Sequence, residues 1–291
     1  MNVAITGASG FLGGYIAAEL QRQGHEVRGQ VRESSDDSYL KEIGAEVVLA
    51  DLEDFNSLRG LLNGCDAVIH NGLHRCPGGA RDNIRYNVGG SLELLELSVE
   101  LGLEQFLFVS SCVVHEKILD DRPLDEAHPL SPSSPYGAYK AAVEAFCNSY
   151  HRRHGLNTSA WRPSEIYGIR RGVKGSNWYD IVQDVKAGKK IDVDYGGKIV
   201  RVEDVASAMV GALGRPEVAG EVFNLTDCHI YRQQVAEYAK EFIGSSSEIS
   251  DYNGPGPKHQ IDCSKAISLR LFEPKGHEGV KDYIRRLLGT V

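Results

Sequence analysis

Two residues four positions apart, Tyr136 and Lys140, stand within the stretch SPYGAYK at positions 134–140. Pro135 suits the first turn of a helix, and the AAVEAFCNSY that follows continues with good helix formers. Residues at i and i+4 share a helix face, so Tyr136 and Lys140 point the same way, whereas Tyr139 packs elsewhere. A free tyrosine has a pKa of about 10, and a neighbouring ammonium favours its phenolate. Such a pair is suited to exchanging a proton with an alcohol or a ketone oxygen.

A glycine pattern near the start, TGASGFLG, places Gly7, Gly10 and Gly13 three residues apart, directly after an apolar strand and at the opening of a helix. In a dinucleotide-binding turn these positions allow the tight turn, the approach of the pyrophosphate and close helix packing. The helix N-terminus adds free N–H groups. An ordinary tight turn is the alternative. The residues expected to bind the cofactor here are Gly7, Ser9, Gly10, Phe11, Leu12 and Gly13.

The end of the second predicted strand bears on the choice of cofactor. In NAD-preferring sites an acid at this place binds the ribose hydroxyls, but here the place falls on Val31, with Arg32 after it. Arg32, with Ser34 and Ser35 nearby, is suited to holding a 2′-phosphate through charge-assisted hydrogen bonds. The sequence therefore favours NADP over NAD, unless Arg32 is a solvated surface charge.

Short apolar strands alternate with amphipathic helices over the first 165 residues. Strands are predicted at 2–6, 25–32, 45–52, 65–72 and 104–111, with one more inside 156–168. Helices are predicted at 10–24, 35–44, 54–64, 87–102 and 134–155. This alternation predicts an α/β fold, a doubly wound parallel Rossmann sheet with helices on both faces.

The pattern loosens after Gly168, which indicates a second, smaller lobe. A strand turning into a helix and one more strand are expected within 199–226, and further helices at 232–243 and 277–288. We therefore predict a dinucleotide-binding domain at 1–167, to which 199–226 returns. A small C-terminal substrate-binding lobe is expected from 168–198 and 227–291.

The overall charge excludes several classes of partner. With a net charge of −8 and a pI near 5.7, the chain is a poor candidate for nucleic-acid or anionic-membrane binding.

No apolar run approaches the ~18 residues that span a bilayer, and the start lacks signal-peptide features, so we expect a cytoplasmic protein. The six cysteines form no CxxC, and the spacing of His70, His74 and Cys76 fits no standard site, so no metal is expected.

Ten short motifs, in order over nearly the whole chain, resemble those of the extended short-chain dehydrogenase/reductases, the NAD-dependent epimerase/dehydratase family. They are TGASGFLG, DLED, VIH, NVGGSLELLE, FVSSCVV, YGAYK, RPSEIYG, RVEDVA, EVFNLTD and IDCSKA. The resemblance implies that Tyr136 and Lys140 are the catalytic pair, that Lys140 also holds the nicotinamide ribose, and that Ser111 binds the substrate oxygen. It further implies cofactor contacts from Asp51, Leu52, Asn87, Arg162 and Pro163.

The chain departs from this family at positions that concern the substrate. The Asp–Glu pair of family dehydratases is replaced by Cys112 and Val113, which argues against sugar dehydration. Glu165 stands where many epimerases have a diphosphate-binding asparagine, and Gly197 where they have an arginine. A UDP- or dTDP-sugar is therefore disfavoured, unless Arg201 compensates.

Further candidates to contact a substrate are His115, which either reaches the substrate or packs, and Arg75, in a loop where a small anion is expected. The first reading is an NAD(P)-dependent oxidoreductase acting on a secondary alcohol or ketone of a small, sugar-like molecule. The alternatives are a sugar epimerase that recycles its bound cofactor and a non-catalytic NADP-sensing regulator. The resemblance also allows a homodimer formed by helices at 88–102 and 135–154 in a four-helix bundle; a monomer is equally compatible with the sequence.

Overall fold

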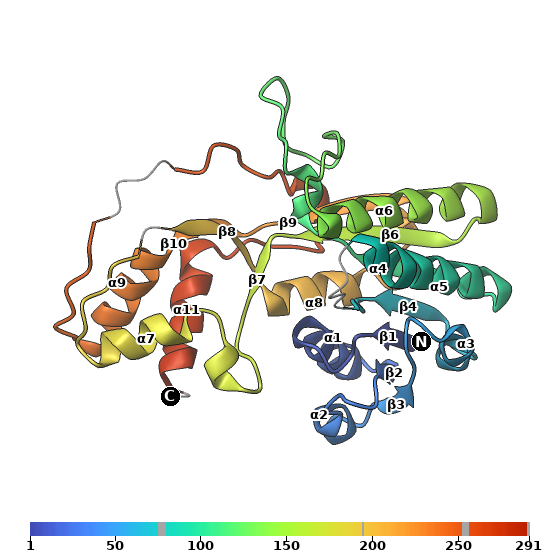
Figure 1. Cartoon of the computed structure of the whole chain (residues 1–291), viewed down its shortest axis with the longest axis horizontal. Helices are drawn as coiled ribbons and strands as arrows, with labels where there is room; N and C mark the ends of the chain where they lie inside the picture. The colour runs from blue at the N-terminus through green and yellow to red at the C-terminus, as the bar shows by residue number, and fades with distance from the viewer. Residues whose placement is uncertain (75–79, 194, 252–255, 290–291) are drawn as a thin grey trace.

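A computed structural model describes residues 1–74, 80–193, 195–251 and 256–289, and Figure 1 shows its arrangement. Seven strands form one sheet in the order β3-β2-β1-β4-β5-β6-β9, every pair parallel. Their bounds are Asn2–Thr6 (β1), Glu26–Val31 (β2), Glu46–Leu49 (β3), Ala67–His70 (β4), Gln105–Val109 (β5), Asn157–Pro163 (β6) and Glu221–Leu225 (β9). The order reverses between β1 and β4, and ligands bind at the carboxyl ends of strands beside such a point. The predicted doubly wound Rossmann sheet is confirmed.

Helices cover both faces of this sheet, as the alternation predicts. One face packs against α1 (Phe11–Arg22), α2 (Ser38–Glu42) and α8 (Val202–Gly211). The other packs against α3 (Phe55–Leu62), α5 (Gly89–Glu100) and α6 (Pro135–His154). Because both faces are buried, the central strands read as continuous apolar runs, such as the fully buried β5.

Local signals set both ends of α6, the helix that carries Tyr136 and Lys140. Ser134 caps its start, where the hydroxyl oxygen accepts a hydrogen bond from the Gly137 N–H at 3.1 Å. Gly155 ends it in the left-handed conformation with φ of 70°. The helix predicted at 134–155 is confirmed, and Tyr136 and Lys140 lie on one face of it.

A second sheet organises the smaller lobe. It has the order β10-β8-β7, built from Glu165–Tyr167 (β7), Gly196–Arg201 (β8) and Cys228–Tyr231 (β10). The helices α7 (Tyr179–Lys186), α9 (Arg232–Ile243) and α11 (Gly276–Gly289) pack against it around a separate apolar core and stand apart from the large sheet in Figure 1. The sequence assigned 165–167 and 199–201 to the dinucleotide-binding domain, but both belong to this second sheet.

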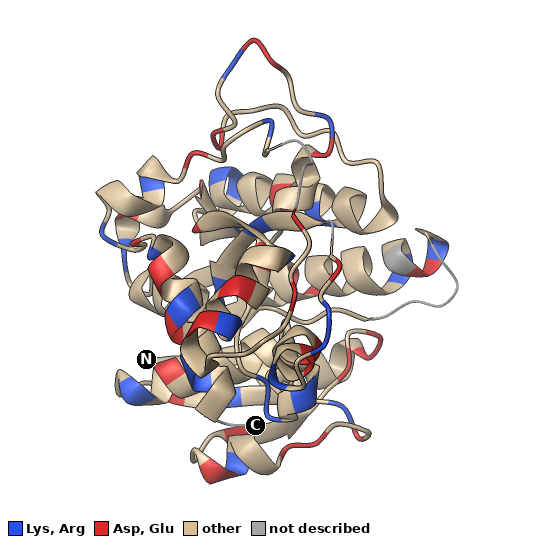
Figure 2. Ribbon diagram, turned by 90° about the vertical axis from the view of Figure 1, so that its left-hand side faces the viewer, with Lys and Arg blue, Asp and Glu red and all other residues tan. Residues whose placement is uncertain are grey.

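Short elements fill the connections: α4 (Ala80–Asp82), a π-helical turn (Asn83–Val88), three 3₁₀ turns (Cys112–His115, Val173–Gly175 and Pro216–Val218) and α10 (Ser264–Ser268). The long segments before α6 and before α10 meet at a bridge between Leu124 and Ile261. In the ribbon of Figure 2, the positions of basic and acidic residues alternate along many of the helices and loops. None of the described helices is both long and apolar enough to cross a membrane.

Candidate active site

The glycine turn between β1 and α1 has the compact shape that a dinucleotide phosphate requires. Gly7 has φ of 66°, a conformation that favours glycine, and its carbonyl accepts the Gly10 N–H at 3.0 Å. A Cβ on Gly13 would collide with that same carbonyl, so a side chain there would push α1 away from the turn. These positions fit the roles that the sequence predicted for them.

A cleft of about 240 Å³ opens over this turn at the carboxyl ends of the strands. Six predicted cofactor residues line it: Gly7, Ser9, Gly10, Arg32, Asp51 and Leu52. Leu12 instead buries its side chain in the core. Sequence reasoning missed Gln30, whose buried amide accepts the Gly7 N–H at 2.8 Å and donates to the Ala50 carbonyl at 2.5 Å. The available signal was a lone amide near the end of the strand EVRGQV.

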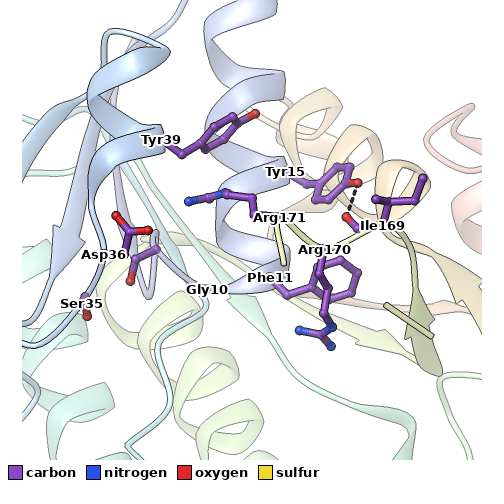
Figure 3. A pocket seen from close by; sticks show the side chains of 11 residues that line it. Gly10, Phe11, Tyr15, Ser35, Asp36, Tyr39, Ile169, Arg170 and Arg171 are labelled. Carbon is purple, nitrogen blue, oxygen red and sulfur yellow. Dashed lines mark hydrogen bonds between the residues drawn. The ribbon is translucent and has the colours of Figure 1, made fainter. Parts of the chain in front are cut away.

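A second cleft, of about 620 Å³, continues from the glycine turn along the outer side of α1. Its far wall is the segment 169–171, which leads from β7 into the small lobe (Figure 3). Arg170 stacks on Phe11 and Arg171 on Tyr39, with 4.0 and 3.9 Å between guanidinium carbon and ring centroid. Phe11, predicted to touch the cofactor, therefore lies where the small lobe meets α1.

Buried polar side chains brace the loop that follows β4. The amide of Asn87 pairs with the backbone of His74, accepting from its N–H at 2.8 Å and donating to its carbonyl at 3.0 Å. His70 lies within hydrogen-bond distance of Thr6 and Ser91, at 2.7 and 2.8 Å, and burial lowers its pKa to about 3. Asn87, predicted to lie behind the nicotinamide, thus shapes the wall of the cleft through its neighbours.

Ser111 comes together with Tyr136 and Lys140, some 25 residues further along the chain, past the end of β5. The Ser111 side chain lies near enough to the Tyr136 phenol to lower its pKa. The Lys140 ammonium lies 5.5 Å from the Tyr136 ring centroid and donates to the Val109 carbonyl at 2.6 Å. Lys140 is 3% exposed and Tyr136 37%, so the phenol stands at the surface of the site with the amine beneath it.

Burial dominates the electrostatics of this group. It lowers the pKa of Lys140 to about 7, although the Glu144 carboxylate offsets part of the effect. Burial also raises the pKa of Tyr136, and the nearby Ser111 side chain lowers that pKa by a smaller amount. The sequence predicted that the ammonium would favour the phenolate, but without cofactor the phenol stays protonated at neutral pH because desolvation prevails.

The lowered pKa of Lys140 makes a testable contribution to stability. Its value of about 7 lies below the unfolded value of 10.5, so the fold carries the cost of a buried charge below pH 7. That cost is relieved as the pH rises from 7 to 10.5, because the unfolded state then binds more protons. In urea unfolding of the cofactor-free protein, the stability of wild type relative to Lys140→Met should therefore rise between pH 7 and 10. A pH-independent difference would contradict the assignment.

Arg162 lies behind the site, and His115 connects it to the cavity wall beside Ser111. The Arg162 guanidinium is 3% exposed and binds both carboxylate oxygens of Glu144, the closest at 2.6 Å. It also donates to His115 Nε2 at 2.9 Å, while His115 Nδ1 lies 3.3 Å from the Pro129 carbonyl. Burial, with the Arg162 charge, lowers the pKa of His115 to about 4. Arg162 therefore forms a buried ion pair, its expected cofactor contact stays a prediction, and both nitrogens of His115 lie near hydrogen-bond partners.

A cavity of about 420 Å³ adjoins Ser111 on the side of the small lobe. Of the predicted substrate residues, Glu165 and His115 line it, and so does the predicted cofactor residue Pro163. Arg201 lies elsewhere, paired with Asp204 at 2.8 Å. Arg75 falls outside the described residues. The remaining lining is Cys112, Val113, Glu116, Ile118, Leu124, Ser164, Lys198 and Ile261.

Lys198 is the basic residue of this cavity that sequence reasoning missed. It stands in β8, a strand expected only from residue 199 onward, and its charge acts on Cys112, the neighbour of Ser111. The missed signal was a lysine directly before the apolar pair Ile199 and Val200 in the segment GGKIVR. Asp51, Glu53 and His74 also gather at the edge of the cofactor cleft, with donor atoms within 4.8 Å of one another.

Residues 3–226 match the model of the NAD dependent epimerase/dehydratase family. The chain is 31% identical over 300 residues to a dTDP-glucose 4,6-dehydratase of Streptomyces antibioticus, covering 94% of this chain and 88% of the relative. It is 28% identical over 236 residues to a 4-hydroxy-2-methyl-3-oxo-4-farnesyl-3,4-dihydroquinoline-1-oxide ketoreductase of Stigmatella aurantiaca, covering 78% and 68%. A UDP-glucose-4-epimerase structure from Stenotrophomonas maltophila with bound NAD and formylated UDP-arabinopyranose matches with a TM-score of 0.78 at 25% identity, covering 98% and 96%. Because the family model spans well over half of the chain, the protein belongs to the NAD dependent epimerase/dehydratase family.

Proposed function

We propose that the protein is an NAD(P)-dependent oxidoreductase that interconverts a secondary alcohol and a ketone on a small substrate. The observation that carries this proposal is the meeting of Ser111, Tyr136 and Lys140 beside an open cavity of about 420 Å³. The cofactor, bound over the glycine turn, supplies a hydride acceptor or donor. The residues of the chain then have to orient the reacting oxygen and move its proton.

Each member of this group has a role that its position supports. The Ser111 hydroxyl, beside Tyr136, orients the substrate oxygen. The Tyr136 phenol passes its proton to a ketone oxygen during reduction and takes it back during oxidation. Lys140, anchored on the Val109 carbonyl, positions the ring above it. Its lowered pKa lets the amine share in proton movement near neutral pH.

Two features favour net oxidation or reduction over the other reactions of the family. Cys112 donates to the Arg162 carbonyl at 3.0 Å, and burial raises its pKa to about 12, so it is no substitute for a dehydratase carboxylate. Glu165 and Gly197 remove contacts for a diphosphate, which disfavours a nucleotide sugar. One relative of this chain is named as a ketoreductase, which supports the proposal. Epimerisation with a recycled cofactor is the second candidate, supported by the epimerase structure.

A spectrophotometric screen separates these candidates. Purified protein with NADPH or NADH is mixed with oxo acids, small ketones, aldoses and sugar acids, and absorbance at the nicotinamide band is followed together with product analysis. We expect stoichiometric loss of NADPH with one or more ketones. Conversion of a sugar to its epimer with no net change of the cofactor spectrum would instead establish the epimerase.

We also propose that NADP is preferred over NAD. Arg32 and Ser35 line the cofactor cleft next to Val31, and Ser34 lies beside them, so no carboxylate of β2 opposes a 2′-phosphate. Arg32→Ala should weaken NADPH binding by about tenfold or more, the loss of a charge-assisted hydrogen bond, while NADH binding changes little. Cofactor fluorescence titrations measure both. Equal effects on the two cofactors, or tighter binding of NADH by the wild type, would contradict the preference.

A further inference from the structure

Lys198 is a half-buried ammonium with no anionic partner in the described part of the chain. No Asp or Glu there lies within 4.0 Å of its nitrogen, whereas the neighbouring Arg201 on the same strand is held by Asp204 at 2.8 Å. Burial lowers the pKa of Lys198, and its charge reaches both Cys112 and His229. A charge that has lost part of its hydration without gaining a counter-ion is a cost to the fold unless a ligand supplies the anion.

The walls around Lys198 are largely apolar. Its cavity is lined by side chains of the loop after β5, the end of β6 and the two long segments that meet at Leu124 and Ile261: Val113, Ile118, Leu124, Pro163 and Ile261. The Ser164 hydroxyl oxygen is buried there with no hydrogen-bond partner among the described residues. A polyhydroxylated sugar would leave most of its hydroxyl groups unpaired against such walls.

The negative charge that fits here is limited to one. Glu165 lines the same cavity, and its Oε2 would lie 3.4 Å from a Cβ built on Gly197, the residue before Lys198. Glu116 also lines the cavity, where its carboxylate accepts a hydrogen bond from the Ser134 N–H. With two carboxylates and one ammonium around the cavity, each additional negative charge on a ligand is repelled, so a monoanion is favoured over a phosphate or diphosphate carrying two charges. Glu165 is exposed whereas Lys198 is half-buried. Solvent therefore screens the attraction between an anionic ligand and Lys198 less than it screens the repulsion between that ligand and Glu165.

We propose that the substrate is a compact carboxylate with a largely apolar body, whose carboxylate binds Lys198 while its carbonyl or alcohol group reaches Ser111 and Tyr136. This inference rests on the proposed oxidoreductase function and names the class of its substrate: an oxo acid or the corresponding hydroxy acid. The apolar wall takes the body of the molecule, Lys198 takes its charge, and the buried Ser164 hydroxyl is a further hydrogen-bonding group at the same wall.

Binding of unreactive acids tests the proposal without turnover. Butanoate, hexanoate, benzoate and 3-phenylpropanoate, each beside its methyl ester, are titrated calorimetrically into the NADPH-loaded protein, so that the cofactor blocks the anion-binding turn. At least one acid should bind ten times or more tightly than its ester. Lys198→Met should abolish this preference while leaving ester binding unchanged, and Lys198→Arg should restore most of it.

Matched variants separate the cavity from general charge effects. Lys189→Met removes a surface lysine of the same lobe, paired with Asp184 and 64% exposed, and should not change acid binding. Glu165→Gln should leave acid binding equal or tighter. The proposal is overturned if no acid binds below 10 mM, about the weakest useful affinity for so small a ligand, if acids and esters bind alike, or if Lys198→Met retains the preference. The proposed function fails separately, if Tyr136→Phe turns over a ketone as the wild type does.

Discussion

Replacing Tyr136 with phenylalanine is expected to lower kcat by about 10²- to 10⁴-fold, the usual contribution of a positioned acid or base. The phenol hydroxyl lies near the Ser111 side chain, while Lys140 beneath it donates a hydrogen bond to the Val109 carbonyl. Phenylalanine keeps the ring that packs on Lys140 and removes the proton donor, so cofactor affinity should be unaffected. Steady-state NADPH oxidation with a ketone found in the screen, and fluorescence titration of NADPH, measure the two quantities.

Tyr139→Phe is the matched control, because it makes the same change three residues along the same helix. The Tyr139 ring is buried at 2% exposure, with its centroid 6.2 Å from that of Phe108, and it lines neither the cofactor cleft nor the cavity. Its kcat should stay near that of the wild type. If kcat fell by a comparable factor in both variants, the loss in Tyr136→Phe would be structural rather than catalytic.

Replacing Glu144 with leucine is expected to lower the free energy of unfolding by about 3–5 kcal/mol, the cost of leaving one member of a buried ion pair alone. Glu144 holds the Arg162 guanidinium at 2.6 Å, with side-chain exposures of 4% and 3%, and also accepts from the Ser110 hydroxyl. Urea denaturation at pH 7 measures the loss, which should appear as a lower midpoint with an unchanged slope.

The double variant Glu144→Leu/Arg162→Met should recover most of this loss, because removing both charges removes the unpaired one. Breaking the exposed Lys189–Asp184 pair by Asp184→Ala should cost at most about 1 kcal/mol. The double variant also decides the role of Arg162. The buried pair predicts unchanged NADPH affinity, whereas the role implied by family resemblance predicts a loss. A Glu144→Leu variant as stable as the wild type would refute the account of this pair.

The parts of the fold and site that the sequence predicted correctly depend on neighbours along the chain. The glycine turn follows from steric limits at Gly7 and Gly13, and α6 from the Ser134 cap, Pro135 and Gly155. The i, i+4 spacing of Tyr136 and Lys140 then places both on one face. Alternating apolar periodicity sufficed to predict the parallel sheet, because a strand buried on both faces has to be apolar throughout. The association of helices α5 and α6 into an intersubunit bundle stays a prediction.

Contacts between distant segments decided what the sequence could not. β7 follows β6 after a single residue, yet it joins another sheet because its partner is β8, some thirty positions away. Arg162, which the family resemblance places at the cofactor, forms a buried ion pair because α6 carries Glu144 beneath it. Lys198 lines the cavity beside Ser111 because β8, the strand that carries it, lies next to that cavity. Desolvation, which sets the pKa values of Lys140 and Tyr136, depends on the packing of all these elements together, and no local pattern of residues encodes it.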